Sequence, residues 1–403
     1  MAAAIKPCKI NVPDAGIAKL KAKLAHASFP DDVEFSNDWT HGSPAADIKR
    51  LVKYWQNGFD WRAQEAKLNE LPQFTTSITV DGFDPIDINF IHQPSKAGSI
   101  PLLFCHGWPG SFIEVVKILP LLTQDDGEGP TFHVVAPSLP NFGFSGLVKT
   151  KGFGIMQYAE AMHKVMLALG YDKYVTQGGD WGFIITRSMA MQFPDNCLAC
   201  HVNCLGARPG LLDLGWLGLK STLGLLSDRE KRETKQMQDH LRRGMGYLAI
   251  QSTKPSTIGF GLEDSPVALL AWIYEKLVTW TDGYPWTDDE ILTWVSIYQF
   301  SSAGPAASVR IYYEAFQSNY PHTKKTFEYI PRVPLGVSHY PKEMSPVPAS
   351  WGRGLGPVVF QAIHDQGGHF AAYECPEAMV TDLKLMFGGK GGAAKVTRYF
   401  AKL

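Results

Sequence analysis

The 403-residue sequence contains no apolar run of the ~18 residues that a membrane-spanning helix needs. The apolar start of the chain is broken at Lys6, so it is too short for the core of a signal peptide. Neither charge dominates, because 38 basic and 39 acidic residues are mixed along the chain. This balance excludes a field that would gather nucleic acid or anionic lipid. We therefore expect a cytoplasmic protein with no membrane anchor, no nucleic-acid partner and a small neutral substrate.

Cysteine is also scarce, and six cysteines without an export signal indicate thiols rather than disulfide bonds. Residues 197–201 (Cys-Leu-Ala-Cys-His) have the spacing of a c-type haem attachment site, to which Cys204 could add a zinc ligand. Residues 198–205, however, have the pattern of a buried strand, in which residues three apart face opposite sides. Cys197 and Cys200 are therefore expected to diverge and to pack as small apolar side chains, with no metal and no cofactor.

The chain has no internal repeats and no low-complexity block apart from a short tail rich in Gly and Lys that begins at Gly388. The composition of this tail predicts flexibility. Its last three residues, Ala401, Lys402 and Leu403, nearly match the tripeptide that directs proteins to peroxisomes, which makes a peroxisomal location the second expectation. The oligomeric state is left open, with a homodimer as one candidate.

The most informative motif that is present spans residues 178–182 (Gly-Gly-Asp-Trp-Gly). It has the form of a nucleophile elbow with Asp180 in the place of the usual serine, between a predicted strand at 174–177 and a predicted helix at 183–193. An aspartate that attacks a saturated carbon leaves an ester, which water can cleave, whereas serine would leave a stable ether. Asp180 therefore predicts the transfer of an alkyl group to water.

A second motif at residues 106–111 (His-Gly-Trp-Pro-Gly-Ser) follows a predicted strand at 101–105. This position is where a nucleophile-elbow protein holds its oxyanion donors. The backbone N–H groups of Trp108 and Trp181 are predicted to stabilise the oxyanion that forms when water attacks the ester of Asp180.

The general base is expected after the nucleophile and the acid in the chain, and His369 meets this order. It follows a predicted strand at 357–360 and is preferred over His364, which we assign to that strand. Glu343, after a predicted strand at 334–338, is the predicted acid that orients His369. Asp365 is the alternative, although its place in the same loop as His369 makes the geometry less favourable.

Four of these motifs, at residues 106–111, 178–182, 340–343 and 367–372, together resemble the microsomal-type epoxide hydrolases, and in particular their soluble fungal members. The resemblance covers nearly the whole chain. It implies a hydrolase that adds water to a lipophilic epoxide, without a cofactor, to form a vicinal diol.

The same family carries two tyrosines in its lid that bind the epoxide oxygen, and the resemblance implies Tyr247 as the first of them. Residues 310–314 imply Tyr312 as the second, with Tyr313 as the alternative. Opening an epoxide releases a strongly basic alkoxide. A phenol with a pKa near ~10 can hydrogen-bond this oxygen and then protonate it at neutral pH.

The resemblance and the order of strand and helix patterns predict an α/β-hydrolase fold with a mostly parallel, doubly wound sheet. We divide the chain into an N-terminal meander that wraps core and lid (1–75), the first part of the core (76–205), a helical lid inserted in the core (206–330) and the second part of the core with the flexible tail (331–403). The lid is rich in tryptophan, and we assign none of its tryptophans to the substrate.

Two other functions are compatible with parts of this pattern. A haloalkane dehalogenase can share the Asp nucleophile, but a halide leaves without a proton, so Tyr247 and Tyr312 argue against it. A lipophilic-ligand binding protein that has lost catalysis would be expected to lack the nucleophile, the acid or the base, and this chain has all three.

Overall fold

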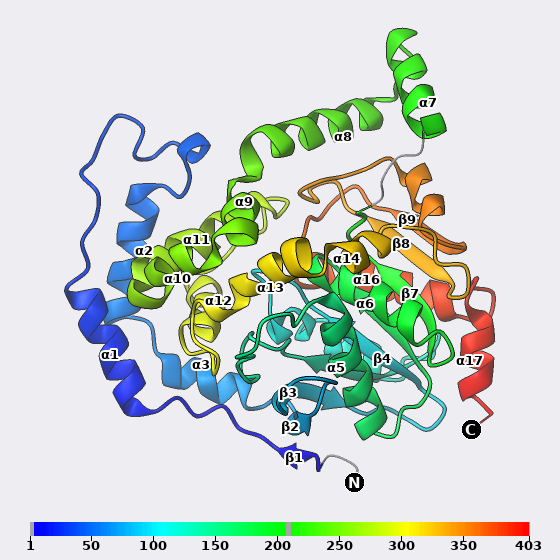
Figure 1. Cartoon of the computed structure of the whole chain (residues 1–403), viewed down its shortest axis with the longest axis horizontal. Helices are drawn as coiled ribbons and strands as arrows, with labels where there is room; N and C mark the ends of the chain where they lie inside the picture. The colour runs from blue at the N-terminus through cyan, green and yellow to red at the C-terminus, as the bar shows by residue number, and fades with distance from the viewer. Residues whose placement is uncertain (1–3, 207–210, 403) are drawn as a thin grey trace.

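A nine-stranded sheet forms the centre of the computed structural model, which describes residues 4–206 and 211–402 (Figure 1). The strand order is β1-β2-β3-β5-β4-β6-β7-β8-β9. Strands β1 to β3 and β5 pair antiparallel, whereas β5, β4, β6, β7, β8 and β9 run parallel. The strands are β1 (Lys6–Pro7), β2 (Gln73–Ile78), β3 (Ile86–Gln93), β4 (Ile100–Cys105), β5 (Phe132–Pro137), β6 (Tyr174–Gly178), β7 (Cys197–Val202), β8 (Leu335–His339) and β9 (Val358–Ile363).

Helices cover both faces of this sheet, which confirms the predicted doubly wound architecture. On one face α5 (Ile155–Ala168) packs against α6 (Trp181–Gln192). Elsewhere α16 (Pro376–Phe387) contacts β8, β9, α4 (Leu119–Thr123) and α17 (Ala394–Phe400). The central strands β4 and β6 are buried along their whole length, as expected for parallel strands between two helix layers.

The lid lies between β7 and β8 in the sequence and over the carboxyl ends of the parallel strands in space (Figure 1). Thr287 and Glu290 form a reciprocal capping box at the start of its central helix, α12. The lid helices are α7 (Leu211–Thr222), α8 (Asp228–Asp239), the π-helix η3 (His240–Gly244), α9 (Gly246–Thr253), α10 (Pro255–Asp264), α11 (Pro266–Thr279), α12 (Asp288–Gln299), the 3-10 helix η4 (Ala307–Val309), α13 (Arg310–Tyr313), the π-helix η5 (Glu314–Ser318) and α14 (Tyr320–Lys325).

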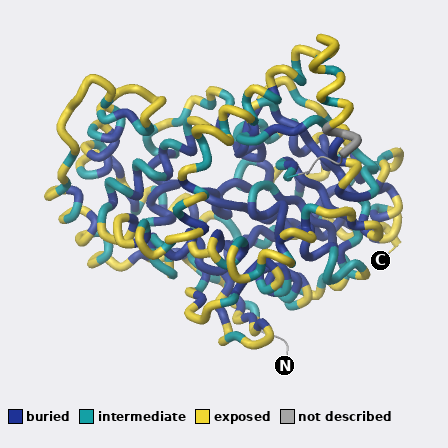
Figure 2. The backbone as a smooth tube through the Cα atoms, turned by 45° about the horizontal axis from the view of Figure 1, so that its top comes forward, coloured by how far each residue is buried: buried dark blue, intermediate teal, exposed yellow. Residues whose placement is uncertain are grey.

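The N-terminal segment packs on the lid through α1 (Asp14–Ala25) and α2 (Ala45–Asn57), and α3 (Trp61–Leu68) also contacts α12. Side-chain hydrogen bonds also join the N-terminal segment to the lid, among them the one from Tyr274 Oη to Asp47 Oδ2 at 3.1 Å. The segment is not separate from the core sheet, because β1 pairs with β2 and our division at residue 75 falls inside β2. Figure 2 shows the buried residues concentrated in the interior of the molecule and the exposed residues mostly at its periphery.

The predicted flexibility of the tail differs from the structure. The tail beyond Gly388 contains helix α17, whose Val396 and Phe400 are buried in the main core, although its Gly- and Lys-rich composition predicted a flexible segment. Leu403, the last residue of the peroxisomal tripeptide, lies outside the described residues. Within residues 4–206 and 211–402, no helix is both long enough and apolar enough to cross a bilayer.

The predicted divergence of Cys197 and Cys200 is wrong. The pairing of β6 with β7 shifts register, so that Tyr174 faces Cys197 and Val175 faces Ala199, which leaves Leu198 as an extra residue. This irregularity turns the two thiols to one side, with their Sγ atoms 3.7 Å apart. In the described part of the chain no group of three His, Cys, Asp or Glu side chains could hold a metal ion.

Candidate active site

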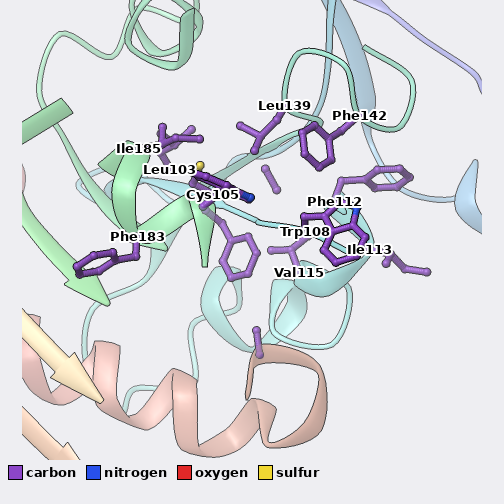
Figure 3. Packing of buried hydrophobic residues seen from close by; sticks show 14 of the residues in the cluster. Leu103, Cys105, Trp108, Phe112, Ile113, Val115, Leu139, Phe142, Phe183 and Ile185 are labelled. Atoms are coloured by element: carbon purple, nitrogen blue, oxygen red, sulfur yellow. The ribbon is translucent and has the colours of Figure 1, made fainter. Parts of the chain in front are cut away.

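Asp180 occupies the tight turn between β6 and α6 and has a positive φ of 49°. A Cβ atom at Gly178 would lie 2.4 Å from the carbonyl oxygen of Gly182, and one at Gly182 would lie 1.9 Å from that of Cys105. Only glycine fits at both positions, and the turn it permits raises Asp180 above the carboxyl edge of the sheet. Figure 3 shows buried hydrophobic side chains of β4 and α6, two elements beside this turn, among them Cys105 and Phe183.

The carboxylate of Asp180 accepts hydrogen bonds from the two backbone N–H groups that the sequence predicts as oxyanion donors. The Trp108 nitrogen lies 2.8 Å from Asp180 Oδ1, and the Trp181 N–H also donates to this carboxylate. Burial raises the pKa of Asp180, while His369 and the two N–H groups act against that rise. In an ester of Asp180, the carbonyl oxygen would lie where these N–H groups now hold a carboxylate oxygen. The same donors can therefore stabilise an oxyanion at that position.

His369 lies between two carboxylates. Its Nδ1 is 2.7 Å from Glu343 Oε1, and its Nε2 is 3.6 Å from Asp180 Oδ2. Burial disfavours the imidazolium, but the negative charges of Glu343 and Asp180 outweigh burial and raise the pKa of His369 to about 9.

The two residues that compete with this pair lie elsewhere. Asp365 is exposed, whereas Glu343 is buried against the imidazole. His364 follows the last residue of β9 instead of belonging to the strand, and its Nε2 lies 2.6 Å from Asp382 Oδ2.

Tyr247 on α9 and Tyr312 on α13 lie above Asp180, with their ring centroids 6.0 Å apart. The Tyr247 ring stacks on Trp108 at 5.4 Å, and the Tyr312 ring stands edge-on to Trp181 at 4.7 Å. Burial raises the pKa of both phenols, and the charge of Asp180 adds to this effect. Both hydroxyls therefore stay protonated at neutral pH. Tyr313, the alternative to Tyr312, is 39% exposed.

The lid also holds the loop that follows β4, and the sequence did not predict this connection. On α12, Trp294 Nε1 donates to the carbonyl oxygen of Pro109 at 2.5 Å, and Tyr298 Oη donates to that of Gly110 at 2.6 Å. These carbonyls belong to the two residues that directly follow Trp108, so α12 holds the loop that carries the Trp108 N–H. Aromatic side chains four residues apart on a helix are typical of ordinary packing, so no sequence pattern distinguishes these two.

Glu114 is a further carboxyl group that sequence reasoning missed. It is buried in the 3-10 helix η2 (Phe112–Val115), and a Cβ atom at Gly110 would lie 1.8 Å from its Oε1. Burial raises the pKa of Glu114 to about 8, with opposing electrostatic effects from His369 and Asp180. The charge of Glu114, when it is present, also raises the pKa of His369, so the two groups are coupled.

A cavity of about 430 Å³ opens above Asp180 between the lid and the core. Its polar groups are few, and besides Asp180 and the two phenols they include His240 and Ser345. The apolar wall suits a lipophilic substrate whose polar atom lies at the catalytic end. The apolar lining comprises Trp181, Phe183, Ile184, Leu205, Met237, Leu241, Met245, Leu248, Phe316, Phe327, Met344, Val347 and Trp351.

Comparison with known proteins finds relatives that cover nearly the whole chain. The chain matches two family models, described as Epoxide hydrolase N terminus over residues 5–115 and as alpha/beta hydrolase fold over residues 100–222. Epoxide hydrolase 1 of Sus scrofa is 34% identical over 95% of this chain and 88% of its own length. Juvenile hormone epoxide hydrolase 1 of Ctenocephalides felis is 33% identical over 94% of this chain and 84% of its own length. The solved structure of Aspergillus niger epoxide hydrolase superposes with a TM-score of 0.81 at 34% identity, covering 95% of both chains.

Proposed function

Because the chain belongs to the epoxide hydrolase family, we propose that it converts lipophilic epoxides to vicinal diols through a covalent ester on Asp180. The proposal depends on one arrangement, a buried carboxylate that faces two protonated phenols across an apolar cavity. The proposed reaction uses side chains, two backbone N–H groups and water.

In the first step the hydroxyls of Tyr247 and Tyr312 donate hydrogen bonds to the epoxide oxygen. Asp180 Oδ2, the oxygen that does not accept the Trp108 N–H, attacks a ring carbon from the opposite side, so that a carbon–oxygen ester bond forms as the ring carbon–oxygen bond breaks. The released alkoxide takes a proton from one phenol. The product of this step is a hydroxyalkyl ester of Asp180.

In the second step His369 removes a proton from water, which attacks the ester carbonyl while the N–H groups of Trp108 and Trp181 stabilise the oxyanion. Esterification removes the negative charge of Asp180, which is one of the charges that hold the proton on His369. The pKa of His369 therefore falls in the ester. The imidazolium then gives a proton to the ionised phenol and becomes the neutral base that activates water. After the attack of water the bond between the carbonyl carbon and the alkyl oxygen breaks, the diol leaves with the proton that the new carboxyl group gives up, and Asp180 is again a carboxylate beside an imidazolium.

Two phenols favour an epoxide over a haloalkane as the substrate. A leaving halide needs no proton, whereas an alkoxide needs a donor that is still protonated at neutral pH. Tyr247 and Tyr312 meet that need, because burial keeps the pKa of each phenol well above its ordinary value.

We extend the proposal to location. Ala401 and Lys402 lie beyond the end of α17 and are exposed, as recognition of a C-terminal tripeptide by an import receptor requires. A fusion with a fluorescent protein at the N-terminus should enter peroxisomes, and deletion of Leu403 should leave it diffuse. A parent fusion that is also diffuse would exclude this location.

Single turnover with excess enzyme and styrene oxide in water enriched in oxygen-18 tests the ester mechanism. Attack of water on the ester carbonyl places the label in the peptide that contains Asp180 and leaves the first diol unlabelled. Label in the first diol would mean that water attacks the ring directly, and Asp180 would then act as a base. Formation of no diol, together with chloride release from chloroalkanes, would favour the dehalogenase.

A further inference from the structure

The loop that carries His369, residues 364–370, is called the base loop, and it contacts the lid directly. The backbone N–H of Gly367 donates to Asp282 Oδ2 at 3.0 Å, and the N–H of His369 itself donates to the carbonyl oxygen of Trp280 at 2.9 Å. The two segments approach so closely that a Cβ atom at Gly368 would lie 2.4 Å from that carbonyl oxygen. Trp280 and Asp282 belong to the lid segment that follows α11 (Pro266–Thr279).

A second carboxylate, Glu374 at the end of α15 (Ala371–Glu374), joins the same two segments. Its Oε2 accepts the N–H of Asp282 at 2.8 Å, and its Oε1 accepts the N–H of Phe370 at 3.1 Å. The N–H of Gly368 also donates to this carboxylate. Glu374 thus holds the peptide groups on both sides of His369 and one peptide group of the lid.

The lid segment held in this way also contacts the imidazole and one phenol. The Trp280 ring stands edge-on to the His369 ring with centroids 5.0 Å apart, and it packs against Tyr247 at 5.2 Å. A shift of this segment would therefore move the wall against which the imidazole rests. Neither carboxylate lines the substrate cavity, so their contribution to the reaction acts through His369.

We infer that Asp282 and Glu374 are positioning residues, a pair of carboxylates that ties the lid to the base loop and so holds His369 in place for hydrolysis of the ester. The inference rests on the proposed role of His369 as the base. Each carboxylate accepts backbone N–H groups across the boundary, Asp282 from the base loop and Glu374 from the lid. Loss of either acceptor leaves peptide N–H groups that are shielded from water without a partner.

The substitution Glu374→Gln tests this inference, because the amide keeps the size of the side chain but has only one accepting oxygen. Stopped-flow measurement separates formation of the ester from its hydrolysis. We expect the hydrolysis rate to fall about 10- to 100-fold, as displacement of a catalytic group by about 1 Å can do. Ester formation should change less than about twofold, because Asp180 and the phenols stay in place.

Glu374→Asp keeps two accepting oxygens on a shorter side chain, and it should recover part of the lost hydrolysis rate. Asp282→Asn should slow the same step. Glu377→Gln is the matched control, since Glu377 is exposed in the first turn of α16, three residues from Glu374. Equal slowing of both steps together with a lower Tm would show a general structural role and would overturn the inference.

The variant His369→Gln separates this inference from the proposed function. If the ester accumulates in His369→Gln but Glu374→Gln hydrolyses it at the parent rate, only the positioning role of the two carboxylates is refuted. If no ester accumulates in His369→Gln, the proposed base is wrong and the positioning role is refuted with it.

Discussion

His369 Nε2 lies 3.6 Å from Asp180 Oδ2, too far for a hydrogen bond and too close for a water molecule to bridge the two atoms. At this distance the two groups interact through their charges, and each favours the ionised form of the other. Conversion of Asp180 to an ester breaks that interaction. The charge state of His369 is therefore linked to the chemical state of Asp180.

Replacement of Asp180 by alanine should abolish both ester and diol formation, with a loss of at least about 10⁴-fold, because among the described residues that line the cavity Asp180 is the only carboxylate. The fold should persist, since the substitution removes a buried charge instead of a packing contact. Rapid-quench mass spectrometry and thermal unfolding test the two expectations. Asp365→Ala, which removes an exposed carboxylate near the base, should keep parent activity, and an Asp180→Ala variant with appreciable turnover would exclude this nucleophile.

The main positions of the site could be predicted from the sequence because each follows a strand. The carboxyl ends of parallel strands meet at one edge of the sheet, so Asp180, Glu343 and His369 meet although they are far apart in the chain. Tyr247 and Tyr312 lie on lid helices, where no such rule applies, and only the family resemblance pointed to them.

Other parts could not be predicted from local patterns. The contacts of Trp294 with Pro109 and of Asp282 with Gly367 join segments separated by 185 and 85 residues, and periodicity carries no information about such pairs. The Cys197–Cys200 pair depends on one extra residue in β7, which reverses the alternation of the strand. The change of register has no marker such as glycine, because the extra residue is Leu198.

The substitutions Tyr247→Phe and Tyr312→Phe should each slow ester formation about 10- to 100-fold, because each removes one hydrogen bond to the developing alkoxide. Hydrolysis of the ester should change little, since the N–H groups of Trp108 and Trp181 stabilise that step. Stopped-flow measurement with excess enzyme distinguishes the two steps. Tyr313→Phe is the control, and a loss for this variant in place of Tyr312→Phe would reverse the assignment of the second phenol.

Glu343→Gln should slow hydrolysis of the ester by about 10²- to 10⁴-fold, because the acid orients the imidazole and stabilises the imidazolium. Loss of the Glu343 charge should also lower the pKa of His369 from about 9. The pH profile of the hydrolysis step measures this change as a displacement of its lower limb toward acid. Asp365→Asn is the matched control, and an equal effect of the two substitutions would contradict the choice of Glu343.

Glu114→Gln should stabilise the protein at alkaline pH. The folded pKa of Glu114 is about 8 against an ordinary value of 4.5, so unfolding releases a proton between these values and stability falls as pH rises from 4.5 to 8. A tenfold difference in proton affinity between the folded and unfolded states corresponds to about 1.4 kcal/mol of stability, although relaxation around the charge reduces the total. Glutamine has no charge to bury, so the Tm of the variant should exceed that of the parent by about 2–5 °C at pH 9 and by much less at pH 5.

His369 also contributes to the pH dependence of stability, and its titration is coupled to that of Glu114. Its folded pKa of about 9 lies above the ordinary 6.5, so the stability that it adds is present below pH 6.5 and is lost as pH rises to 9. That loss occurs in both parent and variant, but it is complete at a lower pH in Glu114→Gln, because the charge of Glu114 raises the pKa of His369. The difference between the two Tm values therefore reports Glu114 together with its interaction with His369. Glu377→Gln, which removes an exposed carboxylate, should leave the two Tm curves nearly superimposed. A Tm difference for Glu114→Gln that is the same at pH 5 and pH 9 would mean that Glu114 is not held neutral by burial.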